Sequence, residues 1–304
     1  MSKISIIGAG NVGATAAQFI AMKGSVDEIV LVDVKENYAE GKAMDISQSL
    51  LILGSKTEVS GHTNNYEPTK DSDIVVVTSG TPRRPGMTRE ELVNVNSKIV
   101  KSVLGEAYKY SPNAIYIIVS NPMDTMAYLA VKYLKSLGKE NAETTVFGMG
   151  GVLDTARFHY YQTTICHKEK DSVEGFVVGG HGDTTMIPVI DDPRDTSGWE
   201  DLEIASEKTK RGGATLTSML GTSAWLAPAA AICETVMDVL NNFTFGESTQ
   251  SVYREEYDAC IGSLVSLGKF GINTITAGEW ENDEAFKASL EAVKKVNENL
   301  TGLI

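Results

Sequence analysis

The chain lacks the cysteine content of a disulfide-stapled protein. Its 304 residues include three cysteines, which are widely scattered and odd in number: Cys166, Cys233 and Cys260. Such a set favours reduced, mostly buried thiols over a disulfide framework. His167 follows Cys166, but the chain holds no C-x-x-C or H-x-x-x-H pair that would complete a metal site. The sequence therefore predicts neither a disulfide scaffold nor a bound metal.

Positive charge is scarce. The 27 lysines and arginines are outnumbered by 40 aspartates and glutamates, which gives a formal net charge of -13 and a pI near 4.8. Nucleic-acid binding rests on clustered cations that face phosphates, so this composition argues against a nucleic-acid partner. Any anionic ligand must be attracted by local arginines against the overall field of the protein.

Long apolar runs are missing as well. No segment reaches the roughly 18 to 20 apolar residues that a bilayer span needs. The amino terminus, MSKISIIGAG, lacks the apolar core and the cleavage site of a secretory signal, and no repeats or low-complexity stretches appear. With 42% hydrophobic and 22% charged residues, the composition is that of a globular protein with two domains or subdomains. We expect it in the cytoplasm, without a membrane partner.

A glycine motif stands near the amino terminus. The β-branched run Lys3 to Ile7 predicts a strand, GAGNVG follows it, and Ala14 to Met22 continues with good helix formers. In this strand–turn–helix context Gly8 allows the tight turn, Gly10 lets the backbone approach a pyrophosphate, and Gly13 lets the helix pack on its strand. The free N–H groups of the helix would face the phosphates.

An acidic residue completes the dinucleotide pattern. The predicted strand Glu28 to Val34 carries Asp33 near its end, twenty residues past Gly13. A carboxylate there accepts hydrogen bonds from the adenosine ribose hydroxyls and repels a 2′-phosphate, so NAD is favoured over NADP. Alternatively, Asp33 merely caps the strand end. Lys35 nearby leaves the exclusion of NADP incomplete.

Strands and helices alternate over the first half of the chain. The expected elements are a helix at Tyr38 to Leu53 and strands at Lys56 to Gly61, Asp73 to Thr78, Ala114 to Val119 and Thr144 to Phe147. Such alternation predicts a doubly wound parallel sheet of the Rossmann type, with ligands bound past the carboxyl ends of the strands. We expect an NAD-binding domain at residues 1–147 and an α+β substrate-binding, catalytic domain at residues 148–304.

A cluster of arginines follows the fourth expected strand. In TPRRPGMTREEL the prolines and the glycine forbid regular structure, and Thr88 with Glu91 forms a capping box that starts a helix beside Arg89. Arg83, Arg84 and Arg89 would then lie on a hinged loop. Guanidinium groups bind carboxylates bidentately, so the loop is suited to close over an anionic substrate. The alternative is a solvated basic loop.

A histidine stands where a buried strand ends. The strand that starts after Glu174 stops at Gly179-Gly180, and His181 follows on a loop, where a titratable group can be aimed into a pocket. Asp154 and Arg157, at i and i+3 of a predicted helix, share one face. If that face opposes His181, the carboxylate would hold the imidazole and the arginine would bind a substrate carboxylate. The alternatives are a surface-turn histidine and a local Asp/Arg ion pair.

Asn121 ends the fifth expected strand, where its amide is placed to reach a substrate hydroxyl or a nicotinamide, although Asn-Pro also begins many turns. Later elements are less specific. We expect a long apolar helix from Gly221, short antiparallel strands from Ser251, and an amphipathic helix from Glu281 to Leu300.

These motifs form an ordered series along the chain: GAGNVG, LVDV, TPRRPGMTR, VSNPMD, GGVLDTARF, GGHGDT and GTSAWLAPAAA. The series resembles the lactate/malate dehydrogenase superfamily, most closely its malate dehydrogenases of the lactate-dehydrogenase-like type, over essentially the whole chain. The resemblance implies an NAD-dependent enzyme of the tricarboxylic acid cycle that acts on (S)-malate and oxaloacetate. It also implies a homotetramer or homodimer.

The resemblance assigns roles to individual residues. His181 corresponds to the proton acceptor and donor, Asp154 to the carboxylate that orients it, and Arg157 to the arginine that binds the shared carboxylate. Arg89 corresponds to the loop arginine that polarises the reacting carbonyl. The cofactor-binding positions are Gly8, Ala9, Gly10, Asn11, Val12, Gly13, Asp33, Asn96, Val119, Ser120 and Asn121, the last of which also contacts substrate.

Arg83 decides between the two branches of that superfamily. Lactate dehydrogenases have glutamine there, whereas the malate branch has arginine to pair with the second carboxylate of oxaloacetate. The physical reason is general, since an unpaired carboxylate in a closed site costs several kcal/mol. A lactate dehydrogenase and a non-catalytic NAD-binding sensor remain as alternatives. The acidic segment DDPRDTSGWEDLEIA and TTICHKEKDSVEGF depart from the family pattern and leave subunit contacts open.

Overall fold

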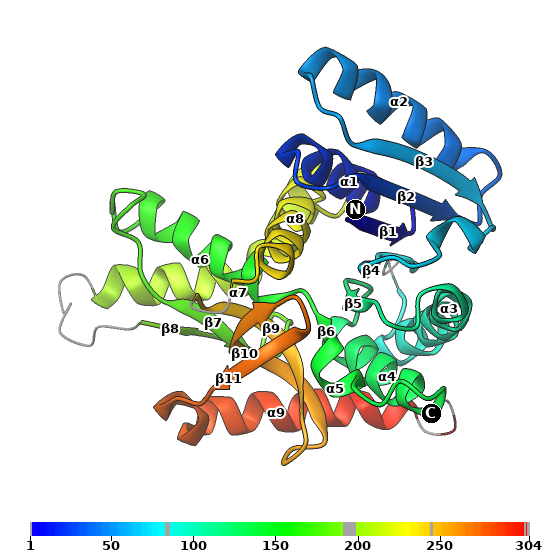
Figure 1. The fold of residues 1–304 in the computed structure, drawn as a ribbon. Coiled ribbons are helices and arrows are strands. Elements are labelled where there is room, and N and C mark those ends of the chain that lie inside the picture. The colour runs from blue at the N-terminus through cyan, green and yellow to red at the C-terminus, as the bar shows by residue number, and fades with distance from the viewer. Residues whose placement is uncertain (1, 83–85, 191–198, 244–245, 301, 303–304) are drawn as a thin grey trace.

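The computed structural model describes residues 2–82, 86–190, 199–243, 246–300 and 302, and it shows a mixed α/β protein built on one continuous sheet (Figure 1). The first six strands are parallel and lie in the order β3-β2-β1-β4-β5-β6. Their bounds are β1 (Lys3–Ile7), β2 (Glu28–Asp33), β3 (Glu58–Thr63), β4 (Ile74–Val77), β5 (Ile115–Ile118) and β6 (Val146–Gly148). The predicted doubly wound parallel sheet is confirmed.

Helices cover both faces of this parallel sheet, in the positions that the alternation predicts. They are α1 (Asn11–Lys23), α2 (Tyr38–Leu53), α3 (Arg89–Tyr110) and α4 (Met123–Ser136), with a 3-10 turn η1 (Glu67–Thr69) and a short α5 (Ala142–Thr145). Ile6 packs on the face that α1 and α8 cover, and Ile7 packs on the face that α3 and α4 cover. Because parallel strands are buried on both faces, they appear in the sequence as continuous apolar runs.

The second half of the chain is antiparallel. Its elements are α6 (Gly151–Thr164), β7 (Phe176–Gly179), β8 (Met186–Val189), α7 (Trp199–Leu220), α8 (Leu226–Leu240), β9 (Ser248–Arg254), β10 (Ala259–Gly268), β11 (Gly271–Thr276), η2 (Glu279–Asn282), α9 (Glu284–Asn297) and η3 (Glu298–Leu300). The sheet continues as β6-β9-β10-β7-β8, with β11 beside β10. Gly148 of β6 pairs with Ser251 of β9, so one backbone contact joins the parallel strands to the antiparallel ones.

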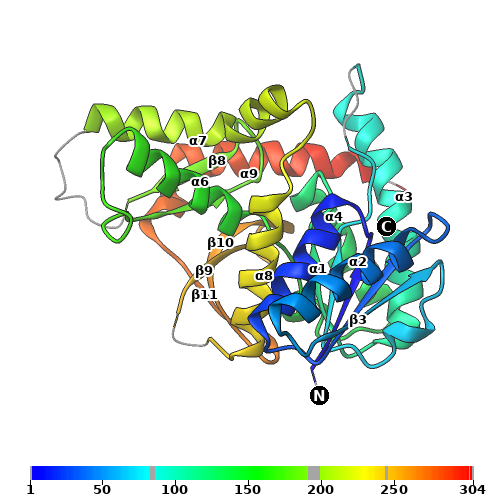
Figure 2. The same ribbon diagram turned by 90° about the horizontal axis from the view of Figure 1, so that it is seen from above.

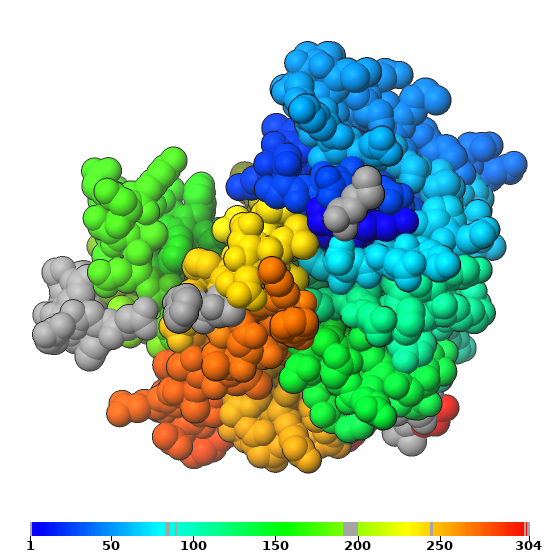
Figure 3. Space-filling model, in the orientation of Figure 1, coloured from blue at the N-terminus to red at the C-terminus, as the bar shows by residue number. Residues whose placement is uncertain are grey.

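Figure 2 shows α1, α2 and α8 together on one face of the parallel sheet, while α9 runs from the antiparallel half toward α4 and α3. In the space-filling view the amino-terminal part (blue to cyan) and α8 (yellow) meet directly (Figure 3). Every helix in the described ranges is too short or too polar to cross a membrane.

Several sequence-based boundaries needed correction. The long apolar helix does not begin at Gly221, because Gly221 has a left-handed φ of 70° and ends α7; α8 begins at Leu226. Helix α7 itself was not predicted. The predicted strand at Thr144 to Phe147 begins as the turn of α5, and β6 starts at Val146. The expected domain boundary between residues 147 and 148 falls inside β6, and it stays a prediction.

Candidate active site

The glycine loop between β1 and α1 leaves a space beside the backbone. Gly8 has a φ of 111°, a conformation that side chains oppose. A Cβ on Gly13 would lie 2.0 Å from the carbonyl oxygen of Gly8, so the helix and the loop touch through glycine. Among the described residues, a Cβ on Gly10 would meet nothing within 4 Å, and none of their side chains caps the start of α1. The loop therefore fits a pyrophosphate, whose charge the free N–H groups and the helix dipole would favour.

Asp33 holds this loop at the end of β2. Its Oδ2 accepts a hydrogen bond of 2.8 Å from the backbone N–H of Ala9, and its Oδ1 accepts one of 2.9 Å from Lys35 N–H. A carboxylate has lone pairs beyond these two bonds, so the residue remains suited to bind ribose hydroxyls. Asp33 therefore remains the residue on which the predicted preference for NAD over NADP depends.

Three further predicted cofactor positions tie together the ends of β4 and β5. Val119 N–H donates to Val77 C=O at 2.9 Å, and the Ser120 hydroxyl donates to Ser79 C=O at 2.5 Å. Asn96, buried on α3, accepts from Thr81 N–H and donates through Nδ2 to the carbonyl oxygens of Thr81 and Asn121. These residues set the shape of the carboxyl edge of the sheet, and their contacts with a cofactor remain predictions.

Asn121 lies at that edge, directly before α4. Its peptide bond to Pro122 is cis, and its carbonyl oxygen accepts a hydrogen bond of 2.6 Å from Asn96 Nδ2. The residue is exposed, so its side-chain amide is available to a ligand. The carboxyl ends of parallel strands are where doubly wound sheets bind ligands.

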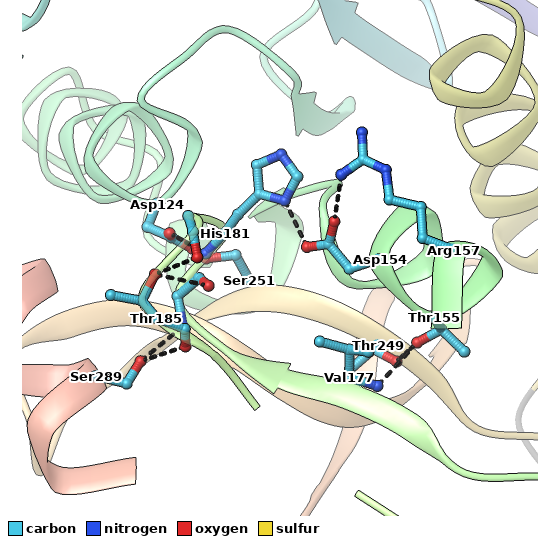
Figure 4. Close-up of polar contacts among 12 residues, drawn as sticks. Asp124, Asp154, Thr155, Arg157, Val177, His181, Thr185, Thr249, Ser251 and Ser289 are labelled. Carbon is cyan, nitrogen blue, oxygen red and sulfur yellow. Dashed lines mark hydrogen bonds and ion pairs between the residues drawn. The ribbon is translucent and has the colours of Figure 1, made fainter. Parts of the chain in front are cut away.

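The structure brings His181, Asp154 and Arg157 together (Figure 4). Nδ1 of His181, on the loop after β7, lies 2.6 Å from Oδ2 of Asp154 on α6. The guanidinium of Arg157, one turn along the same helix, donates to the other carboxylate oxygen at 2.9 Å. Because Nδ1 faces the carboxylate, Nε2 is the imidazole nitrogen left for a substrate.

Burial and charge act against each other at this histidine. The side chain of His181 is 16% exposed and that of Asp154 is 3% exposed. Burial disfavours the imidazolium, but the contact with Asp154 and the negative charge of Asp124 together outweigh it and raise the pKa of His181 above its ordinary value. The arrangement is that of a proton carrier held in one tautomer by a carboxylate.

Glycines bring the backbone close to the imidazole. Gly179 has a φ of 82°, and a Cβ there would lie 2.5 Å from the carbonyl oxygen of Thr185. A Cβ on Gly150, just before α6, would lie 3.1 Å from Nδ1 of His181. The loop therefore turns sharply at the strand end, and the ring packs against the start of α6.

Two residues that the sequence did not reveal support the histidine loop. The backbone N–H of His181 donates to Oδ2 of Asp124 at 2.7 Å, and the hydroxyl of Ser251 donates to Oδ1 at 2.6 Å. Asp124 is 7% exposed. The sequence signal that could have revealed Asp124 is its acidic side chain at the start of a largely apolar helix, where its neighbours Met123, Thr125 and Met126 are buried.

Arg157 has unused hydrogen-bonding capacity. Its Nε is buried and has no hydrogen-bond partner among the described residues. Its side chain passes the glycine pair of α7, where a Cβ on Gly212 would lie 3.2 Å from its Cδ and one on Gly213 3.5 Å from a terminal nitrogen. Buried donors normally find acceptors, so the guanidinium is suited to take an anion in addition to Asp154.

The arginine loop is described only in part. Arg83 and Arg84 lie outside the described residues, and so does the side chain of Arg89, which is the first residue of α3. The predicted capping box is confirmed: Thr88 N–H donates to the Glu91 carboxylate at 2.8 Å, and Glu91 N–H donates to the Thr88 hydroxyl at 3.1 Å.

Comparisons with known proteins agree with the geometry. Residues 2–142 match the family of the lactate/malate dehydrogenase NAD binding domain, and residues 151–301 match the lactate/malate dehydrogenase alpha/beta C-terminal domain. A malate dehydrogenase of Parabacteroides distasonis is 50% identical over 99% of this chain and 98% of that protein. The structure of Cryptosporidium parvum malate dehydrogenase is 33% identical, covers 99% of both chains and has a TM-score of 0.90. A lactate dehydrogenase of that organism, solved with lactic acid and nicotinamide adenine dinucleotide, is 28% identical over 99% of this chain and 98% of that one, with a TM-score of 0.88.

Proposed function

This chain belongs to the lactate/malate dehydrogenase family, and we propose that His181, held by Asp154, carries the proton of its reaction. The chain acts as an NAD-dependent malate dehydrogenase that interconverts malate and oxaloacetate. The 2.6 Å contact between Nδ1 of His181 and Asp154 carries the proposal, because it leaves Nε2 as the one ring nitrogen that can exchange a proton with substrate.

The neutral imidazole takes the proton of the malate C2 hydroxyl as the alcohol is oxidised. In the opposite direction the protonated imidazole returns this proton to the C2 oxygen of oxaloacetate. Asp154 stabilises the imidazolium in both directions and keeps the ring in one tautomer. The chemistry that NAD supplies when bound is acceptance and return of the hydride at C2.

Arginines hold the dicarboxylate in this proposal. Arg157 binds the carboxylate next to C2, which its buried Nε, without a hydrogen-bond partner among the described residues, supports. Arg89 polarises the C2 carbonyl, and Arg83 pairs with the distal carboxylate. The last two roles rest on the family resemblance and on the need of a dicarboxylate for a second cation.

Residues of the parallel half hold the cofactor. Gly10 and the start of α1 take the pyrophosphate, as the open space beside Gly10 supports, and Asp33 takes the adenosine ribose. Asn121 lies at the nicotinamide and the substrate. Asn11, Val12, Asn96, Val119 and Ser120 complete the proposed cofactor site.

A panel of 2-oxo acids tests the assignment. NADH oxidation should show the highest kcat/KM with oxaloacetate, and a preference for pyruvate would move the chain to the lactate branch. A non-catalytic sensor would bind NADH without turnover. A metal-dependent enzyme would lose its activity on exhaustive chelation, whereas malate oxidation should survive this treatment.

The proposed assembly is a homo-oligomer, a tetramer by resemblance or else a dimer. Helices α1 and α8 pack against each other inside the chain (Figure 2). One group of exposed apolar side chains lies on α2 and the end of α1. Leu51, Ile52, Leu53 and Met22 are 82%, 87%, 56% and 51% exposed there. A second copy of the chain would bury this surface.

Light scattering at micromolar concentration tests this assembly, and a monomer would contradict it. Ile52→Lys should weaken the assembly. Phe270→Lys is the matched control, because Phe270 is 84% exposed but lies apart from this surface, in the turn between β10 and β11. The proposed compartment is the cytoplasm, where the protein would serve the tricarboxylic acid cycle and the thiols of Cys233 and Cys260 would stay reduced.

A further inference from the structure

Asp124 is a buried carboxylate that the proposed mechanism does not use. It is the second residue of α4, in the parallel half, and both its oxygens bind groups of the antiparallel half. Oδ2 accepts a hydrogen bond of 2.7 Å from the backbone N–H of His181, and Oδ1 accepts one of 2.6 Å from the Ser251 hydroxyl on β9. The carboxylate therefore joins the loop of the proposed proton carrier to the start of the helix that Asn121 precedes (Figure 4).

Titratable and polar groups of several elements surround this loop, which itself carries the exposed Asp183. Helix α6 contributes Asp154 and Arg157, and α4 contributes Asp124, which acts electrostatically on both His181 and Asp154. Strand β10 contributes the buried thiol of Cys260, and α9 contributes a hydroxyl, that of Ser289, which binds Gly180 N–H at 2.9 Å. When His181 is protonated, the two carboxylates balance the imidazolium and the guanidinium.

Several contacts oppose the cost of burying this carboxylate. Burial raises the pKa of the Asp124 carboxyl above its ordinary value, while the Ser251 hydroxyl and the His181 loop act in the opposite direction. The Asp124 carboxylate accepts two hydrogen bonds and lies in the first turn of α4, and both features favour its ionised form.

We propose that Asp124 is a positioning residue for the reaction: its ionised carboxylate fixes the backbone of His181 and, together with Asp154, stabilises the protonated imidazole. The inference rests on the proposed function only in taking His181 as the proton carrier. It adds a second negative charge, supplied by the other half of the molecule, to the pair of His181 and Asp154.

Asp124→Asn separates charge from contact. The amide oxygen can still accept from His181 N–H, and the amide nitrogen can donate to the Ser251 hydroxyl, so both hydrogen bonds have a counterpart while the charge is gone. A purely structural role would leave the titration of His181 unchanged. A role in stabilising the imidazolium predicts that the pKa of His181 falls by about 0.5 to 1 pH unit.

Histidine-selective isotope labelling and NMR titration give that pKa directly, because the chain has only four histidines. The resonance of His181 is identified by its loss in His181→Asn. The high-pH limb of kcat/KM for oxaloacetate reduction, which needs the protonated imidazole, should move to lower pH by the same amount in Asp124→Asn. An unchanged pKa of His181 would overturn the proposal.

Ser289→Ala is the matched control, since it removes the hydroxyl that accepts from Gly180 N–H on the same loop and leaves Asp124 and its two contacts in place. The pKa of His181 should stay unchanged in this variant, and a fall equal to that in Asp124→Asn would show that packing of the loop alone is responsible. If Asp124→Asn does not fold, Asp124→Ser, which also removes the charge, takes its place in the same titration. Because the NMR titration needs no turnover, a wild-type protein inactive on oxaloacetate would refute the proposed function without deciding this inference.

Discussion

The two halves of the molecule build their sites from different parts of the chain. In the parallel half, the candidate cofactor site is largely backbone: Gly8, Gly10 and Gly13 leave room for a pyrophosphate, and Asp33 holds the loop through Ala9 N–H. In the antiparallel half, the candidate catalytic site is made of side chains: the ring of His181 contacts Asp154 of α6, and the backbone N–H of His181 donates to Asp124 of α4. The proposed pyrophosphate and ribose positions lie within residues 8–33, whereas the catalytic side chains come from segments far apart in sequence.

The difference bears on how each site can fail. A backbone site depends on the absence of side chains, so a single added methyl group blocks it. A side-chain site depends on particular functional groups, so the fold can survive their loss while the chemistry stops. Substitutions in one half should therefore affect cofactor binding, and substitutions in the other should affect turnover.

His181→Asn should have the largest effect. Without its proton carrier the enzyme should lose roughly 10²- to 10⁴-fold in kcat, while NADH binding in the other half stays nearly unchanged. Asp154→Asn should lower kcat in the same way but less severely. Steady-state kinetics and a fluorescence titration with NADH measure both quantities. Retained turnover in His181→Asn would remove the residue from the mechanism.

Arg83→Gln should be next. The change leaves the distal carboxylate of oxaloacetate unpaired in a closed site, with an expected loss of roughly 3 to 5 kcal/mol, or some 10² to 10⁴ in kcat/KM. Turnover of pyruvate, which has no such carboxylate, should hold steady or rise. Arg84→Gln is the control and should matter little. Equal losses with both substrates would mean that the loop only closes the site.

Gly13→Ala and Gly10→Ala test the backbone site as a pair. The new methyl group of Gly13→Ala would meet the Gly8 carbonyl at 2.0 Å, so we expect a loss of about 1 to 3 kcal/mol in the free energy of unfolding. The methyl group of Gly10→Ala meets open space, so the melting temperature should hold while NADH binds more weakly. Thermal melting and NADH titration separate the two, and equally stable variants would contradict the packing argument for Gly13.

Lys139 should give the smallest effect, and one confined to the parallel half. The side chain is 3% exposed and donates to the carbonyl oxygens of Pro112 and Ala114 at 2.9 Å each. Burial lowers its pKa from the ordinary 10.5 to about 8. Between these two pH values Lys139 is protonated in the unfolded chain but has lost its proton in the folded chain. Its contribution to the free energy of unfolding therefore rises with pH.

Across that pH interval the free energy of unfolding should rise by about 1 to 3 kcal/mol. The rise stays modest because the two carbonyl oxygens partly stabilise the buried charge. Lys139→Met should remove the rise without changing the pH profile of kcat/KM. Urea unfolding of both proteins at pH 7.5 and pH 10 measures it, and parallel stability curves would refute the lowered pKa.

Local features were predicted well from the sequence. The strand–glycine–helix unit at Gly8 and the capping box of Thr88 and Glu91 have the expected form, because short-range backbone geometry and hydrogen bonds dictate them. The contact between Asp154 and His181 was predicted only on the condition that the helix face of Asp154 and Arg157 opposes the histidine. Helical spacing shows which residues share a face, but it does not show what packs against that face. Helix α7 was missed because its first turn adjoins an acidic segment without apolar periodicity.

Residues such as Asn96 show why a motif does not determine a contact. The cofactor contact expected for Asn96 stays a prediction, whereas the three hydrogen bonds by which it joins Thr81 to Asn121 were not expected from the sequence. Gly212 and Gly213, in the middle of α7, make room for the side chain of Arg157. Neither arrangement follows from the residue type.

By itself, the sequence determined the parallel sheet, the glycine loop with Asp33, and the histidine at the end of a strand, because each depends on apolar periodicity or on conformational preferences of neighbouring residues. Tertiary structure alone decided that Asp124 meets His181 and Ser251, which are 57 and 127 positions away. Those contacts require that β6 pair with β9, so that the start of α4 comes to lie against the loop after β7. Such docking is fixed by the packing of both halves of the chain at once, which no local pattern specifies.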